Sequence, residues 1–238
     1  MISGDAGSPS VVRFGEKGQV WLEVTATGRA NHGAHVHLGV NAIERLMVVI
    51  DRLSTLRSHE CPLPDEVRAA IVASASVSEA ISGAGEAEML QRVTVNIGTI
   101  KGGTAVNMIP DRAVARLDIR MPAGVKVADI LAAVESLLCD LPWASFTVLN
   151  ACETNWTDPT HEIVRLTHAN SRMVLEHEAV VNMRLGFSDA RFYRQHGVPS
   201  LVYGPTPHNM GGCNEYVTLE DLFAVFAVHA MTAFDYLQ

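Results

Sequence analysis

Two polar side chains in the stretch 98–122 could bind an anion. Asn107 stands between two strand-like runs, and Arg120 stands at the end of the second run. An amide and a guanidinium supply directed hydrogen-bond donors that suit a carboxylate or a developing oxyanion. A turn asparagine and a surface arginine would give the same pattern, and spacing alone favours that plainer interpretation. The stretch therefore predicts two paired strands that carry a candidate anion site.

Three histidines lie within six residues of a loop: His32, His35 and His37. They are not at the i, i+4 spacing that places two metal ligands on one face of a helix. Exposed loop histidines are therefore the plainer interpretation, and it is the one favoured for His35 and His37. Asp5 and Glu215 are loop carboxylates that could bind a hard cation, although a lone carboxylate in a loop is usually solvated or caps a helix. From their types alone, these residues are candidate ligands and no more.

The composition is that of a folded protein with an acidic balance. Of the 238 residues, 48% are hydrophobic and 18% are charged, which is enough to build the core of one or two domains. The formal net charge of −8 argues against nucleic acid or an anionic membrane as a partner. No apolar run reaches transmembrane length, and the first residues lack the basic and apolar regions of a signal peptide. The four scattered cysteines predict neither a disulfide framework nor a structural zinc site, and they favour a cytoplasmic location.

The elements between residues 20 and 149 predict an α+β unit. Apolar alternation predicts strands near 20–27, 93–97, 113–119 and 146–149, and helical spacing predicts helices near 43–53 and 127–138. This order is that of the split βαβ, ferredoxin-like fold, with both helices on one face of an antiparallel sheet. The segment 59–88 fits less well, because two prolines interrupt it and its Ala/Ser-rich part could form a short helix or a mobile excursion.

The composition changes beyond Cys152. We expect a helix over 161–174, a turn at 185–189 that opens another helix, a short buried strand at 200–203 and a final helix from Leu219. A Pro/Gly-rich loop, 204–212, separates the last two elements. This alternation predicts part of an α/β layer whose remaining strands are missing.

Four blocks of the sequence resemble, in order, the M20 family of metal-dependent amidohydrolases. This group contains acetylornithine deacetylase, succinyl-diaminopimelate desuccinylase, aminoacylase-1 and carboxypeptidase G2. The matching stretches are 18–28 with His32 and 39–43; 98–103 with 107–111 and 120–122; 188–191 with 197–199; and 203–205 with 214–217.

The resemblance implies a zinc-peptidase-like α/β catalytic domain and an inserted ferredoxin-like lid that forms a homodimer. On this basis, we expect residues 18–152 to form the lid, and residues 1–17 with 153–238 to form the C-terminal part of the catalytic domain. The family holds two divalent ions, which are zinc, or cobalt or manganese. In the family, the histidine at the His32 position reaches across the dimer to polarise the scissile carbonyl, and the groups at Asn107 and Arg120 bind the substrate carboxylate or the oxyanion. Asp5 falls at the position of a metal ligand.

Two departures from the family pattern affect the metal site. The family's His-x-Asp pair, bridging Asp and Glu-Glu pair all lie upstream of the Asp5 position, and this chain begins after them. We therefore expect the isolated chain to be hydrolytically inactive unless an N-terminal segment or a companion chain supplies them. In addition, glycine fills the usual position of the ligand histidine ahead of Glu215, and His208 lies a few residues too early. Either the loop bends His208 into the site or another ligand replaces it.

The leading hypothesis is an M20-type hydrolase that cleaves the amide bond of an N-acyl amino acid or a small peptide, with this chain supplying the lid and the C-terminal half. The alternatives are an inactive remnant that only dimerises, and a module that binds carboxylates through Asn107 and Arg120. The sequence does not identify the substrate.

Overall fold

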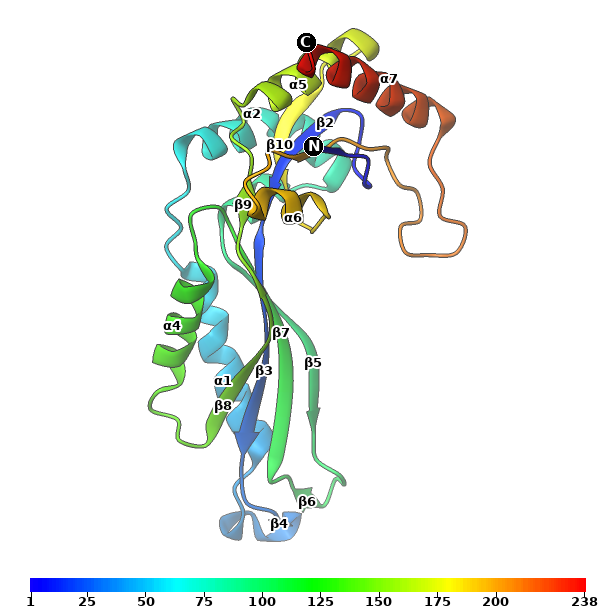
Figure 1. Cartoon of the computed structure of the whole chain (residues 1–238). Helices are drawn as coiled ribbons and strands as arrows, with labels where there is room; N and C mark the ends of the chain where they lie inside the picture. The colour runs from blue at the N-terminus through cyan, green and yellow to red at the C-terminus, as the bar shows by residue number, and fades with distance from the viewer.

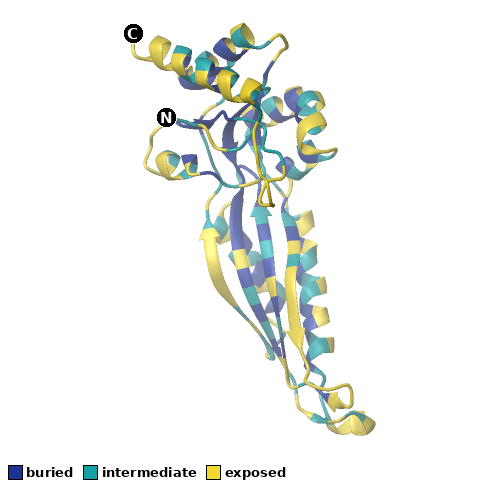
Figure 2. Cartoon of the chain, turned by 90° about the vertical axis from the view of Figure 1, so that its right-hand side faces the viewer, coloured by how far each residue is buried: buried dark blue, intermediate teal, exposed yellow.

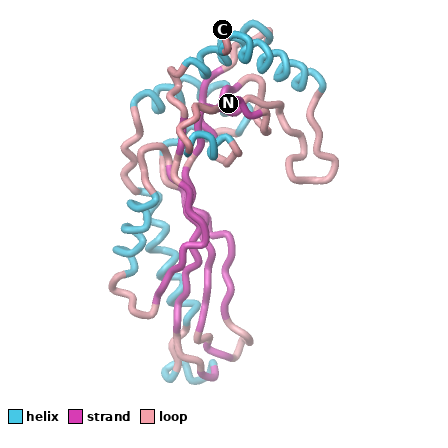
Figure 3. The backbone as a smooth tube through the Cα atoms, viewed as in Figure 1, coloured by secondary structure: helices cyan, strands magenta, loops and turns pink.

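Two separate β-sheets, connected by one continuous strand run, organise the chain. The computed structural model describes residues 1–238 and is elongated, with a helix-rich upper unit and a long lower unit that ends in a narrow tip (Figure 1). Strand β2 (Val11–Glu16) belongs to the upper sheet, and β3 (Gly18–Thr27) belongs to the lower sheet. Only Lys17 separates them, so the backbone passes from one sheet to the other almost without a break (Figure 3).

The lower sheet has the predicted ferredoxin-like order. Its strands β3, β5 (Thr94–Gly102), β7 (Arg112–Met121) and β8 (Ala144–Cys152) are arranged as β5-β7-β3-β8, and every neighbouring pair is antiparallel. Helices α1 (Ala42–Ser54) and α4 (Val127–Leu138) pack on one face. Because side chains alternate along a strand, Val20, Leu22 and Val24 all point into that core and are fully buried. The predicted lid architecture is therefore confirmed.

The tip of the lower unit is built from short elements. Strand β4 (Asn31–His32) pairs with β6 (Met108–Ile109), and a 3₁₀ helix, Gly33–Leu38, follows β4. Asn41 caps α1, since its Oδ1 accepts from the backbone N–H of Ile43 at 2.9 Å. Burial decreases toward this end, where most residues are exposed (Figure 2). The histidine loop therefore lies at the extreme of the molecule.

The upper sheet is mixed and short-stranded. Its order is β1 (Ile2–Ser3), β11 (Leu201–Val202), β2 and β10 (Val180–Arg184), and β9 (Asn155–Trp156) pairs with β2. Helix α5 (Glu162–Val174) packs against α7 (Leu219–Tyr236), and the short helix α6 (Ala190–Gln195) contacts β9. These elements match the expected strand-loop-helix alternation. No helix, including α7, is long and apolar enough to cross a bilayer.

The segment 59–88 differs from its prediction. It contains an 18-residue helix, α2 (Asp65–Ser82), followed by α3 (Glu86–Gln91). The buried face of α2 carries Val67, Ile71, Ser74 and Ser78 at helical spacing. Two of those four side chains are serines, so the apolar periodicity is weak. The sequence pattern therefore does not predict the full length of the helix.

The molecule has two hydrophobic cores. One lies between the lower sheet and its helices, and the other fills the upper unit. Val67 and Ile71 of α2 and Leu90 of α3 belong to the upper core, although they fall inside the range 18–152. The division at residues 18 and 152 remains a prediction, and this packing argues for giving residues 63–91 to the upper unit.

Candidate functional site

His32 and Asn107 lie side by side at the tip. His32 pairs with Met108 in the β4–β6 ladder, and the N–H of Gly33 donates to the carbonyl of Asn107 at 2.7 Å. His32 Nδ1 accepts from the N–H of Ala34 at 3.2 Å, so in the neutral ring the proton sits on Nε2. Both side chains are exposed. The tip therefore presents an imidazole N–H donor and an amide to whatever docks there.

Arg120 lies at the opposite end of the lower sheet, next to the upper unit. It is eight positions beyond Arg112 along β7, which at about 3.3 Å per residue is roughly 26 Å. The guanidinium forms a two-point ion pair with Asp118, at 2.8 and 3.0 Å. Asn107 and Arg120 therefore lie at opposite ends of β7 and do not come together within one chain.

Arg120 meets the upper unit through an aromatic ring. Its guanidinium carbon lies 4.9 Å from the centre of the Phe187 ring, and that of Arg191 lies 4.8 Å from the same centre. Arg191 also stacks on Phe192 at 4.4 Å. Cations are attracted to the face of an aromatic ring at these distances. Phe187 thus brings one guanidinium from each unit together, a cluster that the sequence interpretation missed.

A buried network fixes the turn that carries Phe187. Glu16, the last residue of β2, is fully buried and forms an ion pair with Arg194 of α6. Its carboxylate also accepts from the backbone N–H of Ser188 at 2.5 Å and from the Ser188 hydroxyl at 3.0 Å. Burial raises the pKa of Glu16, while Arg194 and the Ser188 bonds favour its ionised form. Strand β2, through Glu16 at its end, therefore also anchors the turn that carries Phe187.

The three candidate metal ligands have partners within the chain, and Glu215 accepts from the N–H of Gly211 at 3.1 Å. Asp5 forms an ion pair with Arg184 at 2.9 Å and accepts from the N–H of Ala6 at 2.8 Å. His208 stacks on Tyr216, with ring centres 4.7 Å apart, in the loop that projects below α7 in Figure 1. No three His, Cys, Asp or Glu side chains converge anywhere in the chain. The residues present thus do not by themselves form a site for the two divalent ions that the resemblance implies.

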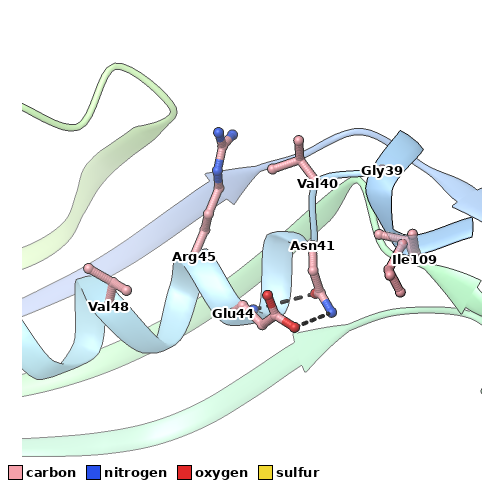
Figure 4. Close-up of a pocket in the computed structure, with 8 residues that line it drawn as sticks. Gly39, Val40, Asn41, Glu44, Arg45, Val48 and Ile109 are labelled. Carbon is pink, nitrogen blue, oxygen red and sulfur yellow. Dashed lines mark hydrogen bonds between the residues drawn. The ribbon is translucent and has the colours of Figure 1, made fainter. Parts of the chain in front are cut away.

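A cavity of about 410 Å³ opens beside the tip. Val36, Val40, Val48 and Ile109 contribute apolar surface, and the polar lining comes from the start of α1 (Figure 4). In that figure, the Asn41 amide points at the Glu44 carboxylate, 3.4 Å away. Asn41 and Glu44 bond to one another, and Asn41 also caps the start of the helix. The guanidinium of Arg45 donates to the carbonyl of Thr27 at 2.6 Å.

Comparison with known proteins identifies the lower unit. A family model described as a peptidase dimerisation domain matches residues 14–142, which is more than half of the chain. A protein named succinyl-diaminopimelate desuccinylase from Gluconacetobacter diazotrophicus is 27% identical over 223 residues, which cover 92% of this chain and 51% of the relative. A probable carboxypeptidase from Aspergillus niger is 26% identical and matches over 87% of this chain and 44% of its own length. The chain spans about half the length of the curated relatives it matches.

Solved structures share the fold at low sequence identity. An M20 family metallo-carboxypeptidase from Sulfolobus solfataricus superposes with a TM-score of 0.75 at 16% identity, covering 96% of this chain and 61% of that protein. A tripeptidase from Staphylococcus aureus gives a TM-score of 0.74 at 17% identity, with 99% and 56% covered. The sequence match and the shared fold agree. The chain belongs to the M20 peptidase family and carries the dimerisation domain of that family.

Proposed function

We propose that this chain forms the lid and the C-terminal part of an M20-type, metal-dependent amidohydrolase or peptidase. Its substrate is an N-acyl amino acid or a small peptide, and the bond cleaved is the amide. In this proposal, Arg120 binds a substrate carboxylate, while His32 and Asn107 donate to the carbonyl oxygen under attack and stabilise the charge that develops there.

The observation that carries this proposal is the separation of the tip from Arg120. His32 and Asn107 are exposed and together at one end of the lower unit, roughly 26 Å or more along β7 from Arg120 at the other end. Groups that far apart cannot act on one small substrate within one chain. A homodimer resolves this, since the tip of one copy can then enter the site beside Arg120 of the other copy.

An exposed apolar face on α7 supports a larger catalytic half. Leu219, Phe223 and Phe226 recur on one side of the helix and are exposed by 70%, 66% and 71%. Exposed apolar patches of this kind mark contacts with other polypeptide. We assign the face to the remaining half of the M20 fold, because the relatives carry about as much chain again as is present here. That half would also have to supply most donors for the two divalent ions.

Subunit complementation tests the proposal. His32→Ala and Arg120→Ala are each expected to abolish hydrolysis of an N-acyl amino acid by the zinc-, cobalt- or manganese-loaded enzyme, reconstituted with its metal-binding half. When the two variants are mixed, half of the dimers are hybrids, and each hybrid holds one site with both residues intact. About a quarter of wild-type activity is then recovered. No recovery on mixing would refute the shared site, because residues acting within one chain cannot complement each other.

A second candidate function is a dimerisation module that binds carboxylates without catalysis. It is favoured by the absence of any convergent group of three metal-binding side chains. The same preparation decides between the two. If it dimerises and binds an N-acyl amino acid but retains neither metal nor hydrolysis, the second function holds. Plasma emission measures the retained metal, and sedimentation equilibrium measures dimerisation.

A further inference from the structure

Lys17 is a buried cation without an acidic partner. It is the single residue between β2 and β3, and only 1% of it is exposed. Its ammonium donates to the carbonyls of Met89 and Arg92, at 2.6 and 2.7 Å, and no carboxylate lies within ion-pair distance. Lysine is almost never fully buried unless it is paired. A side chain held in this costly position is therefore a candidate for a specific role.

The two carbonyls mark the junction between α3 and β5. Met89 lies in the last turn of α3, and Arg92 is the residue that ends it, two positions before β5 begins at Thr94. Carbonyls at the end of a helix lack partners within the helix, and a cationic side chain can satisfy them. Lys17 therefore fastens the connection between β2 and β3 to the segment that precedes β5.

Arg120 lies between the two segments of chain that Lys17 joins. In the lower sheet, Arg120 lies between Gln19 of β3 and Thr94 of β5. Gln19 is two residues after Lys17, and Thr94 is two residues after Arg92. The hydrogen bonds from Lys17 thus connect the segments that lead into β3 and β5. These are the two strands that pair with β7 on either side of Arg120, whose guanidinium contacts Phe187.

A second cation, Arg13 of β2, fastens helices α2 and α3. Arg13 forms a buried ion pair with Glu86 at 3.1 Å and donates to the hydroxyls of Ser78 and Ser82 at 3.2 and 2.9 Å. It also donates to the carbonyl of Met183 in β10 at 2.6 Å. Arg13 ties α2 and α3 to the upper sheet, so the junction that Lys17 holds is fixed to that sheet as well.

We propose that Lys17 is a positioning residue that holds the α3–β5 junction and thereby sets Arg120 against Phe187 and Arg191 of the upper unit. The effect on substrate rests on the proposed function, whereas the effect on the Arg120 geometry does not. The titratable and charged groups that influence Lys17 electrostatically are the Cys61 thiol, Arg120 and Asp118. Burial lowers the pKa of Lys17 to about 7, with Arg120 acting in the same direction and Cys61 and Asp118 opposing it.

The side-chain Nε–H signal of Arg120 in a ¹⁵N NMR spectrum reports this geometry directly. Lys17→Met removes the amine while keeping an apolar chain of similar length. It is expected to shift the Arg120 signal and to speed amide hydrogen exchange at least tenfold at residues 92–95 and 118–121. Lys101→Met, at an exposed lysine of β5, is the matched control and should change neither. An unchanged Arg120 signal in Lys17→Met overturns the proposal, because a residue that only fills space would lower stability without moving that signal.

The wild-type chain replaces the variant if Lys17→Met does not fold. The chain has three lysines, Lys17, Lys101 and Lys126, so the ¹³Cε signal of Lys17 can be followed from about pH 6 to about pH 9. The Arg120 signal is expected to shift with the same midpoint, and a flat signal overturns the proposal. Neither measurement needs hydrolysis, so its failure is distinguishable from a failure of subunit complementation.

Discussion

The guanidinium of Arg13 and the carboxylate of Glu86 form an ion pair, 3.1 Å apart, that is almost completely buried between β2 and α3. Arg13 makes three further hydrogen bonds there, to Ser78, Ser82 and the carbonyl of Met183. The pair joins residues that are 73 positions apart in the chain. It holds helices α2 and α3 against the upper sheet, although the chain enters and leaves this segment from the lower unit.

Glu86→Ala should strongly destabilise the fold, because it leaves the Arg13 charge buried without its partner. Loss of one partner of a buried pair costs about 3–5 kcal/mol. Glu88→Ala is the control in the same helix, since Glu88 forms an exposed pair with Arg92, and its loss should cost less than about 1 kcal/mol. Urea denaturation measures both values. Equal effects of the two variants would contradict a special role for the buried pair.

The stability of the wild-type chain should rise with pH just above neutrality. The pKa of Lys17 is about 7 in the folded chain and 10.5 in the unfolded chain. Between these values the unfolded state binds one proton more than the folded state, so the free energy of unfolding increases by up to about 1.4 kcal/mol per pH unit. The gain is fully present above the unfolded value and is lost as the pH falls to about 7. Lys17→Met should lack this slope in denaturation series between pH 7 and pH 9, and a parallel slope in both proteins would contradict the assignment.

Gly28→Ala should disrupt the tip. A Cβ at Gly28 would lie 2.1 Å from the carbonyl oxygen of Val40 and 2.9 Å from the N–H nitrogen of Ala42, and backbone cannot move aside cheaply. We expect a loss of about 1–3 kcal/mol, together with faster hydrogen exchange at Asn31 and His32. Gly98→Ala is the control, because its Cβ would meet nothing closer than 3.6 Å. A tip that exchanges normally in Gly28→Ala would show that the loop can rearrange.

On the proposed function, Arg120→Ala should weaken binding of an N-acyl amino acid by about 10- to 100-fold, which corresponds to the loss of a hydrogen bond to a charged group. Arg116→Ala is matched to it, since Arg116 lies on the same strand and its ion pair with Glu23 is more exposed. Isothermal titration calorimetry of both variants measures the difference. Similar affinities would remove Arg120 from the binding site.

The lid could be predicted from the sequence because its patterns agree at every level. The strands alternate, the helices have apolar stripes, and Asn41 caps the helix that follows it. Helix α2 could not be predicted in the same way, since Ser74 and Ser78 occupy its buried face. Ser78 is tolerated there because Arg13 and Asn182 bond to its hydroxyl, and neither residue is near it in the sequence.

The candidate site could be predicted only in part. The residue types at His32, Asn107 and Arg120 were visible, but their places in space depend on strand length and on which elements meet. The predicted strand 113–119 lies between Asn107 and Arg120, so the sequence already implied that they occupy opposite ends of the sheet. The contact of Arg120 and Arg191 with the Phe187 ring could not be predicted, because it joins two units whose relative placement no local sequence pattern encodes.

The tip lies far from Lys17, the single residue between β2 and β3. The ten residues of β3 extend about 33 Å. A change of about 10° in the direction of β3 at Lys17 would move the tip by about 6 Å, which is twice the length of a hydrogen bond. The position of His32 relative to a second copy of the chain is therefore sensitive to small changes in the geometry at Lys17.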